Sequence, residues 1–213
     1  MNIAIIGAGG MGRELHALIE TINSKEKRYN FIGWFDDNKS PGEYINGQPV
    51  IGNISDLNSV KDSLAVAIGI GDPSLKSNLI AKINNHNIHF PYLIHPSLSF
   101  FDFQKIKIGK GVIIQSNCSL TTNITLSDYV FLSPNCTIGH DSYIGKYCSI
   151  MPGANIAGNV IIKENVFFGI GACSLQGITI EKGCTIGAGS TLTKNTKEGL
   201  TYVGVPGVEL PHK

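Results

Sequence analysis

The sequence predicts two domains. The first is an α/β domain with a small Rossmann-like parallel sheet over residues 1–100, and the second is an all-β parallel β-helix with a short C-terminal tail over residues 101–213. Short aliphatic runs alternate with helical stripes in the first hundred residues, as in strand–helix–strand folds. From about residue 102, a six-residue repeat of large apolar residues replaces that alternation. A chain of 213 residues is long enough for two such domains.

The α/β domain begins with "NIAIIGAG", an aliphatic run that ends in glycines and predicts a buried strand entering a turn. The next segment, "MGRELHALIETIN", predicts a helix because its apolar residues have helical spacing, at Leu15, Leu18, Ile19 and Ile22. "NFIGWFDD" is typical of a second strand. Residues 36–55 are rich in Gly, Asn and Pro, so we expect mainly loop there.

The rest of this domain continues the alternation. "SLAVAIGIG" predicts a third strand, and Asp72 and Pro73 then suit the N-cap and the first position of a helix. The apolar stripe of that helix runs through "SLKSNLIAKINNH". "HFPYLIHP" favours a fourth strand, which completes a small parallel sheet.

The second domain is defined by its repeat. Every sixth residue from Ile108 to Leu192 is large and apolar, with Ser174 as the one exception among the positions of this frame. The position four residues later is small or β-branched almost throughout, and it holds four of the five cysteines: Cys118, Cys136, Cys148 and Cys184. We interpret these cysteines as small buried residues, and not as metal ligands or disulfide partners.

A hexad repeat of this kind predicts a parallel β-helix with three hexads in each triangular coil, so that fifteen hexads form five coils. The large aliphatic residue fills the interior. Glycines directly after it are expected to ease the tight backbone of the corners, at Gly109, Gly139, Gly145, Gly169 and Gly187. The period alone does not fix the handedness of the helix.

The repeat resembles that of the hexapeptide-repeat acyltransferases, whose family fold is a left-handed β-helix. The preceding α/β domain, the stretch "IGHDSYIGKYCSIMPGANIAGNVIIKENVFFGIGACS" and the tail "GAGSTLTKNTKEGLTYVGVPG" narrow the resemblance to sugar acetyltransferases of bacterial glycan pathways. These include sialic acid O-acetyltransferases and N-acetyltransferases of nucleotide-activated 4-amino sugars. The resemblance implies acetyl-CoA as co-substrate, no metal, and a homotrimer with its active sites between neighbouring subunits.

His140 and Asp141 are the candidate catalytic residues. His140 lies at a corner of the predicted β-helix, and Gly158 stacks on it one coil later, which would leave room for a ligand and expose a backbone N–H. The resemblance implies that His140 is the general base and that Asp141 orients it. Adjacent residues of a strand point oppositely, so this pairing requires a bent corner or a neighbouring subunit. The alternative is an exposed corner histidine beside a solvated carboxylate.

The same resemblance implies that acetyl-CoA contacts Ser149, Gly158, Ile170 and Ala188, and that the N–H of Gly158 stabilises the oxyanion. Related N-acetyltransferases often have a second histidine where this chain has Ser149. This departure puts identical cofactor contacts in doubt.

The segment "GAGGMG" follows a predicted strand and opens a helix, which is the context of a phosphate-binding turn. Its glycines and the acids after the second strand are compatible with NAD, although no second set of residues for hydride transfer is visible. The resemblance instead implies a nucleotide-linked sugar, held by Gly9, Gly10, Met11, Asp36, Asp37 and Gly69. Met11 stands where related enzymes often have a histidine. A purely structural turn is the remaining alternative.

Composition excludes several function classes. The net charge of +1 gives no general attraction for nucleic acid or anionic membranes, and no apolar run is long enough to span a bilayer. These features predict a cytoplasmic protein, and the resemblance implies an acetyltransferase that acetylates the amine of a nucleotide-activated 4-amino-dideoxy sugar. O-acetylation of a sialic acid or another sugar hydroxyl, a β-helix scaffold and an NAD-binding module are the alternatives.

Overall fold

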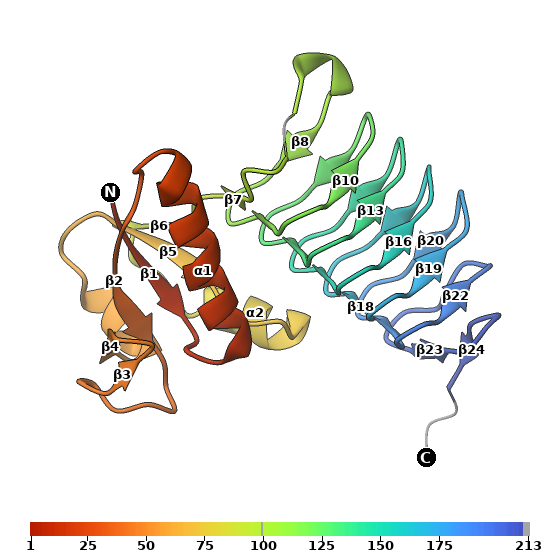
Figure 1. The fold of residues 1–213 in the computed structure, drawn as a ribbon. Coiled ribbons are helices and arrows are strands. Elements are labelled where there is room, and N and C mark those ends of the chain that lie inside the picture. Colours follow the sequence, from red (N-terminus) through yellow and green to blue (C-terminus); the bar gives the residue numbers. More distant parts are fainter. Residues whose placement is uncertain (99, 211–213) are drawn as a thin grey trace. The chain divides into compact units, whose positions relative to one another are not determined.

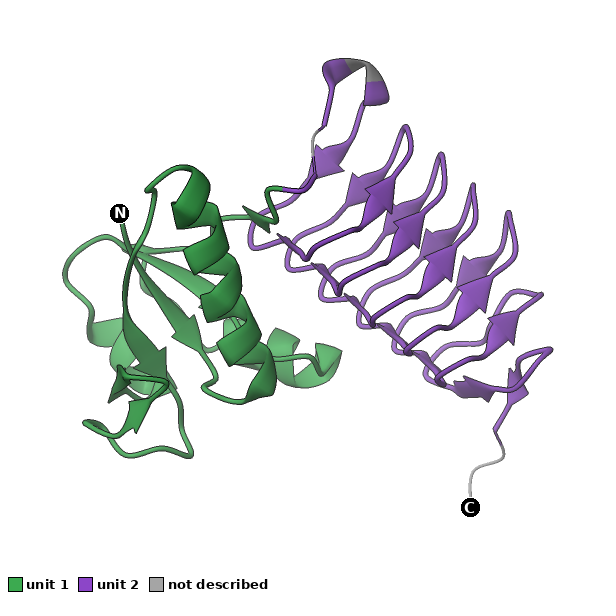
Figure 2. Ribbon diagram, in the orientation of Figure 1, with its two compact units in different colours: residues 1–96 green, residues 97–213 purple. Residues whose placement is uncertain are grey.

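The structure, a computed structural model, describes residues 1–98 and 100–210. The chain forms two compact units, residues 1–96 and residues 97–213 (Figure 2). Within the described part of the chain, no helix combines the length and the apolar character needed to cross a membrane.

Unit 1 is built on a six-stranded sheet of order β3–β4–β2–β1–β5–β6 (Figure 1). All neighbouring strands are parallel except the β3–β4 hairpin. The strands are β1 (Asn2–Ile6), β2 (Asn30–Phe35), β3 (Tyr44–Ile45), β4 (Gln48–Gly52), β5 (Leu64–Ile68) and β6 (Ile88–His89), followed by β7 (Leu93–Ile94). The helices are α1 (Gly10–Lys25), the 3₁₀ turn η1 (Ile54–Ser59) and α2 (Pro73–Ile80).

Most of the predicted elements of unit 1 are present. The helical stripe of α1 is buried as expected, at Leu15, Leu18, Ile19 and Ile22. Helix α2 begins where predicted, because the Asp72 carboxylate accepts the N–H of Leu75 at 2.8 Å and Pro73 occupies the first turn.

Two predictions for unit 1 were wrong in detail, and the prediction that residues 36–55 are mainly loop was right but incomplete. Residues 36–55 contain the β3–β4 hairpin, because Val50 pairs with Trp34 and is buried at the sheet edge. Helix α2 ends at Ile80, and the chain after it is tied to the η1 region instead, because the Asn85 side chain donates to the carbonyls of Leu57 and Val60. The expected fourth strand is split into β6 and β7 around Pro91, which has no N–H to donate.

One histidine of unit 1 packs among aromatic rings. The His16 ring on α1 lies 4.2 Å from the Phe31 ring and 5.5 Å from the Trp34 ring, centroid to centroid. Burial lowers the pKa of His16, and the nearby Glu20 carboxylate offsets this only in part.

Unit 2 is a left-handed β-helix whose two-residue strands form three walls (Figure 1). Wall A contains β10 (Ser119–Leu120), β13 (Thr137–Ile138), β16 (Asn155–Ile156), β19 (Cys173–Ser174) and β22 (Thr191–Leu192). Wall B contains β8 (Lys107–Ile108), β11 (Thr125–Leu126), β14 (Tyr143–Ile144), β17 (Ile161–Ile162) and β20 (Thr179–Ile180). Wall C contains β9 (Ile113–Ile114), β12 (Phe131–Leu132), β15 (Ser149–Ile150), β18 (Phe167–Phe168) and β21 (Thr185–Ile186), continued by β23 (Thr201–Val203) and β24 (Val208–Glu209). The 3₁₀ turn η2 (Asp102–Gln104) precedes β8.

The hexad frame predicted these strands residue by residue. In each wall, a strand pairs in parallel with the strand 18 residues later, as Thr137 pairs with Asn155 and Ile138 with Ile156. From β8 to β22, the second residue of each strand is the large apolar residue of the repeat, except Ser174 in β19. Ile138, Ile144 and Ile150 of one coil are at most 1% exposed, so the column fills the interior as predicted.

The cysteines of the small-residue column lie between coils. Each thiol donates a weak hydrogen bond to a carbonyl 13 to 15 residues further on, as Cys136 does to Met151 at 3.2 Å and Cys184 to Lys197 at 3.0 Å. The interpretation of this column as packing is therefore consistent with its contacts.

The corners contain a second six-residue pattern. Every sixth residue from Gly111 to Gly189 has a positive φ, in the left-handed region. Most of these residues are Gly or Asn, which tolerate that conformation, and Asp141 at φ +59° belongs to the same series. The pattern bends the chain at each corner.

The glycines after the aliphatic column have a different role from the one predicted. They lie outside the left-handed series. The backbone of the next coil passes directly over four of them, and Gly187 lies against the Val203 side chain. A Cβ on Gly139 would lie 2.5 Å from the carbonyl carbon of Ala157 and 2.5 Å from the nitrogen of Gly158. Close approach between coils therefore requires these glycines, and the residue two positions later makes the turn.

Candidate active site

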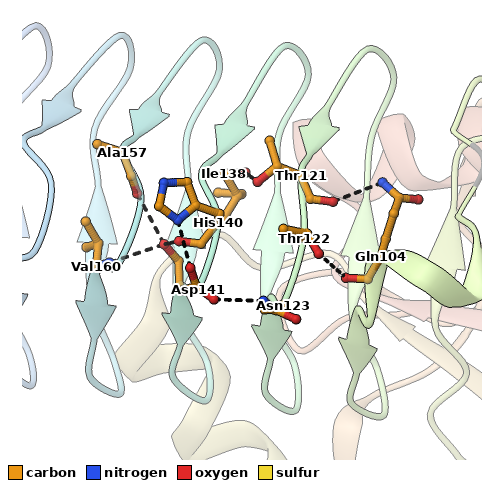
Figure 3. Close-up of polar contacts among 10 residues, drawn as sticks. Gln104, Thr121, Thr122, Asn123, Ile138, His140, Asp141, Ala157 and Val160 are labelled. Carbon is orange, nitrogen blue, oxygen red and sulfur yellow. Dashed lines mark hydrogen bonds and ion pairs between the residues drawn. The ribbon is translucent and has the colours of Figure 1, made fainter.

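His140 and Asp141 form a contact pair at the corner between walls A and B. Nδ1 of His140 lies 2.8 Å from Oδ2 of Asp141, and both side chains are 50% exposed (Figure 3). The left-handed backbone of Asp141 turns the two neighbouring side chains to the same side of the chain. A bent corner therefore suffices for the pairing, and no neighbouring subunit is needed for it.

The corner backbone is fixed on both sides of the pair. The N–H of Asp141 donates to the carbonyl of Thr122 one coil earlier at 3.0 Å, and the carbonyl of His140 accepts the N–H of Asn159 at 2.6 Å. Behind the pair, the buried Ser142 hydroxyl bridges the coils: it donates to the carbonyl of Ala157 and accepts the N–H of Val160, each at 3.2 Å. The exposed pair therefore stands on a rigid base.

Asp141 has a second partner that the sequence did not reveal. Nδ2 of Asn123 donates to Oδ1 of Asp141 at 2.9 Å, from the same corner position one coil earlier (Figure 3). The hydrogen bonds from His140 and Asn123 hold the pKa of the Asp141 carboxyl below its usual range. The carboxylate is therefore ionised at neutral pH and can fix the Nδ1–H tautomer of His140, with the lone pair on Nε2.

Gly158 is where the stacking predicts it, but the space beside it is filled differently. A Cβ on Gly158 would lie 2.5 Å from Nε2 and 2.6 Å from Cε1 of His140. The imidazole ring itself therefore occupies the space that was expected for a ligand. Gly158 is required so that the ring can lie over the next coil.

The other predicted acetyl-CoA contacts fall on a different corner. Ile170 and Ala188 are stacked and exposed at the corner between walls C and A, with the N–H of Gly189 bonded to the carbonyl of Ile170. Wall A separates this corner from the corner of His140, because His140 follows a wall A strand and Ile170 precedes one. Ser149 lies in β15 of wall C and is fully buried. The surface of this chain therefore does not present Ser149 for a contact with acetyl-CoA.

The glycines of the first unit divide into two groups. Gly7, Gly12 and Gly69 pack against one another where β1, α1 and β5 meet, and a Cβ on Gly69 would lie 2.7 Å from Cα of Gly12. Gly9 and Gly10 have open space where a Cβ would stand. The first group is required by packing. The second group leaves the N-terminus of α1 accessible to a ligand.

The paired acids lie beside this turn. Oδ2 of Asp36 accepts the N–H of Ala8 at 2.8 Å, and its Oδ1 accepts the N–H of Asn38 at 2.8 Å. Asp37 accepts the N–H of Ile54 at 2.9 Å. Both acids thus shape the loops around the turn, and each carboxylate keeps lone pairs for a ligand.

A cleft of about 630 Å³ opens at the carboxyl ends of β1, β2 and β5. Gly9, Asp36, Asp37 and Gly69 line it, as do three polar residues that the sequence analysis missed: Asn38, Asn78 and Lys82. This is the edge where open α/β sheets bind ligands. Asn78 and Lys82 come from α2 and the turn after it, for which the sequence showed only an apolar stripe.

Gly10 and Met11 are not among the cleft-lining residues. Met11 instead packs on the turn after β5, since a Cβ on Gly71 would lie 2.9 Å from Cε of Met11. The predicted substrate residues are therefore brought together in part, with Met11 at the side of the group.

Comparison with known proteins connects both units to one family. Residues 2–83 match the PglD N-terminal domain, and residues 159–194 match the hexapeptide repeat of succinyl-transferase. GDP-perosamine N-acetyltransferase of Escherichia coli O157:H7 is 27% identical over 190 residues, which cover 89% of this chain and 85% of that protein.

Solved structures agree over nearly the whole length. The acetyltransferase domain of PglB from Neisseria gonorrhoeae, solved in complex with acetyl coenzyme A, is 28% identical with a TM-score of 0.86, and 98% of each chain is covered. WeeI from Acinetobacter baumannii is 26% identical with a TM-score of 0.85, covering 99% of this chain and 100% of that one. The α/β unit and the hexapeptide β-helix are both similar to those of hexapeptide-repeat sugar acetyltransferases, and the comparisons support this family for the chain.

Proposed function

We propose that this protein transfers the acetyl group of acetyl-CoA to the amine of a nucleotide-linked 4-amino-dideoxy sugar in glycan biosynthesis, with His140 as general base. The observation that carries the proposal is the geometry of His140. Its Nδ1 is held by Asp141 at 2.8 Å, and its ring projects half-exposed from a rigid corner. With the proton on Nδ1, Nε2 is the basic atom.

The chemistry needs one base and no covalent intermediate. The neutral amine of the sugar attacks the thioester carbonyl, a C–N bond forms, and Nε2 of His140 takes the proton that the nitrogen loses. The C–S bond then breaks, and the imidazolium returns the proton to the CoA thiolate. The N–H of Gly158, below the ring, is our candidate donor to the oxyanion.

Asp141 serves this step by position and charge. Its ionised carboxylate keeps the Nδ1–H tautomer and stabilises the imidazolium that forms during the reaction. The low pKa of the Asp141 carboxyl supports this role, because the carboxylate stays ionised through the neutral range.

The acceptor assignment is supported by the cleft of unit 1. Its glycine turn offers main-chain N–H groups at the start of α1, Lys82 offers a cation for a phosphate, and Asp36 and Asp37 offer acceptors for sugar or base hydroxyl and amino groups. A relative that spans 89% of this chain is a GDP-perosamine N-acetyltransferase, which supports an amine as the acceptor. We propose that Ile170 and Ala188 contact acetyl-CoA along the opposite edge of wall A.

We also propose a homotrimer. Tyr143 and Ile161, which point outward from wall B next to the His140 corner, are 41% and 44% exposed in the single chain. Packing of this face against another subunit would remove their apolar surface from water. Light scattering coupled to size exclusion tests this directly, and a monomeric mass at micromolar concentration would contradict it.

The test of function follows the release of CoA thiol from acetyl-CoA with a panel of acceptors. The panel contains GDP- and UDP-linked 4-amino-dideoxy sugars, other nucleotide-linked amino sugars, and free and CMP-linked sialic acid. We expect release with one amino sugar and a loss of about 100-fold or more in kcat for His140→Ala. Lys146→Ala is the matched control, because Lys146 occupies the corner position six residues later and is 54% exposed. Release with sialic acid alone would move the chemistry to a hydroxyl, and no release with any acceptor would contradict the proposal.

A further inference from the structure

We propose that Asn123 is a positioning residue for the reaction, which holds the Asp141 carboxylate in the orientation that aligns His140. This inference rests on the proposed role of His140 as the base. Two hydrogen bonds in series carry it: Nδ2 of Asn123 donates to Oδ1 of Asp141 at 2.9 Å, and Nδ1 of His140 donates to Oδ2 of Asp141 at 2.8 Å (Figure 3). The two carboxylate oxygens thus have one partner each.

The Asp141 carboxylate needs such a partner because it is half-exposed. One hydrogen bond leaves a carboxylate free to rotate about its terminal bond, which is a broad torsion. A donor on the second oxygen fixes the plane of the group and therefore the direction of the lone pair that faces His140. The amide of Asn123 supplies that donor without adding a charge beside the imidazolium.

Asn123 is itself anchored. Its backbone is left-handed at φ +54°, and its N–H donates to the carbonyl of Gln104 at 2.8 Å. The same carbonyl accepts the hydroxyl of Thr122 at 3.0 Å, while the Gln104 amide donates to the carbonyl of Thr121 at 3.0 Å (Figure 3). The turn η2 therefore fixes the backbone from which the Asn123 amide reaches Asp141.

The β-helix provides a matched control. Asn159 has the same place in the hexad frame one coil after Asp141, it has φ +56° and it is exposed. The hydrogen bonds of the described residues connect its N–H to His140 and give its side chain no bond to Asp141. Glycine adopts the left-handed conformation readily, so Asn123→Gly and Asn159→Gly both keep the backbone and each removes one amide.

The experiment measures kcat and both KM values for Asn123→Gly, Asn159→Gly, Asp141→Asn and the double variant Asn123→Gly/Asp141→Asn. We expect Asn123→Gly to lower kcat by about fivefold at unchanged KM, which corresponds to one hydrogen bond to an exposed charged group. We expect Asn159→Gly to keep the wild-type rate. The double variant should be no slower than Asp141→Asn, because residues that act through one another are not additive. Equal rates for the two glycine variants, or additive losses in the double variant, would overturn the proposal.

A second readout does not depend on activity. The ¹³C shift of the Asp141 carboxyl, followed through an acid titration, reports the pKa of that group. We expect Asn123→Gly to raise the midpoint toward the ordinary aspartate value and Asn159→Gly to leave it in place. An unmoved midpoint would refute the contact in solution. An inactive wild-type protein with a moved midpoint would instead place the failure in the proposed function.

Discussion

The substitution Gly158→Ala tests the site most sharply, because it changes the space of one side chain and little else. The added Cβ would lie 2.5 Å from Nε2, 2.6 Å from Cε1 and 2.8 Å from Cδ2 of His140. All three contacts are with the end of a half-exposed side chain, so the imidazole moves and the main chain stays. Gly158 lies outside the left-handed series, so alanine fits its backbone.

The size of the effect follows from the distances. Ordinary contact begins at 3.4 Å, so relieving the 2.5 Å contact displaces the ring by about 0.9 Å. That movement exceeds what a 2.8 Å hydrogen bond to Asp141 can absorb, and misplacement of a catalytic group by about 1 Å can cost about 100-fold in rate. We therefore expect kcat to fall by about 30- to 100-fold. The free energy of unfolding should change by less than about 1 kcal/mol, since alanine also reduces the entropy of the unfolded chain.

The assay is CoA thiol release with saturating substrates, together with urea unfolding of the same preparations. Gly139→Ala is the control, and its main effect should be on stability. Its Cβ would meet main-chain atoms of Ala157 and Gly158 at 2.5 Å, and neither can move alone. It should lower the free energy of unfolding by about 2 kcal/mol or more. A Gly158→Ala enzyme with wild-type kcat would refute the placement of the His140 ring over Gly158 during the reaction.

The remaining predictions concern unit 1. Gly12→Ala should destabilise the protein by about 2 kcal/mol or more in urea unfolding, because the new Cβ would overlap the carbonyl oxygen of Gly7. Asp36→Ala removes the acceptor of the Ala8 N–H, so it should raise the KM of the sugar nucleotide by about tenfold and leave that of acetyl-CoA unchanged; equal changes in both would contradict the cleft assignment. Because the pKa of His16 is lowered in the folded state, the unfolded chain binds its proton more tightly, and stability should be lost as the pH falls from the ordinary 6.5 through the folded value. Wild type should therefore lose more stability than His16→Gln between about pH 7.5 and 5, and parallel curves would refute the burial effect.

The β-helix could be predicted from the sequence because each position of the six-residue repeat has one packing role, and the residue type at that position shows the role. The six-residue spacing alone identified the interior column, and Ile138 pairs with Ile156 as that spacing requires. The same sequence contains the left-handed column from Gly111 to Gly189, which its Asn and Gly residues signal. The glycines after the aliphatic column were expected to form the corners instead. The sequence alone cannot distinguish a glycine that adopts a positive φ at a corner from a glycine that the backbone of the next coil covers. Both positions favour glycine because it has no side chain.

The residues of the His140 corner could be predicted, because each is identified by its own type and by its position in the six-residue repeat. Features that depend on neighbouring parts of the chain, such as burial, could not. His140, Asp141 and Gly158 stand together as their spacing indicates. The burial of Ser149 could not be inferred, because an outward position in a strand does not say what covers it. Lys82 was also missed, since a lysine after a helix has no distinguishing pattern until the cleft is seen.

The position of the pair suggests why a structural repeat can carry catalysis. Each hexad from Gly111 to Gly189 bends at the same place, so the residue before the bend and the residue at the bend can always face the same side. At other corners, the residue before the bend can form an ion pair, as Lys146 does with Asp128 at 3.3 Å. The corner of His140 differs from this pattern at two positions. Asp141 stands at the bend, where most corners have Asn or Gly, and Gly158 in the next coil makes room for the imidazole ring. A histidine with a fixed tautomer therefore requires only side-chain changes on a backbone that the fold already supplies. In the mechanism that we propose, the rigidity of the stacked coils would keep this histidine aligned during proton transfer.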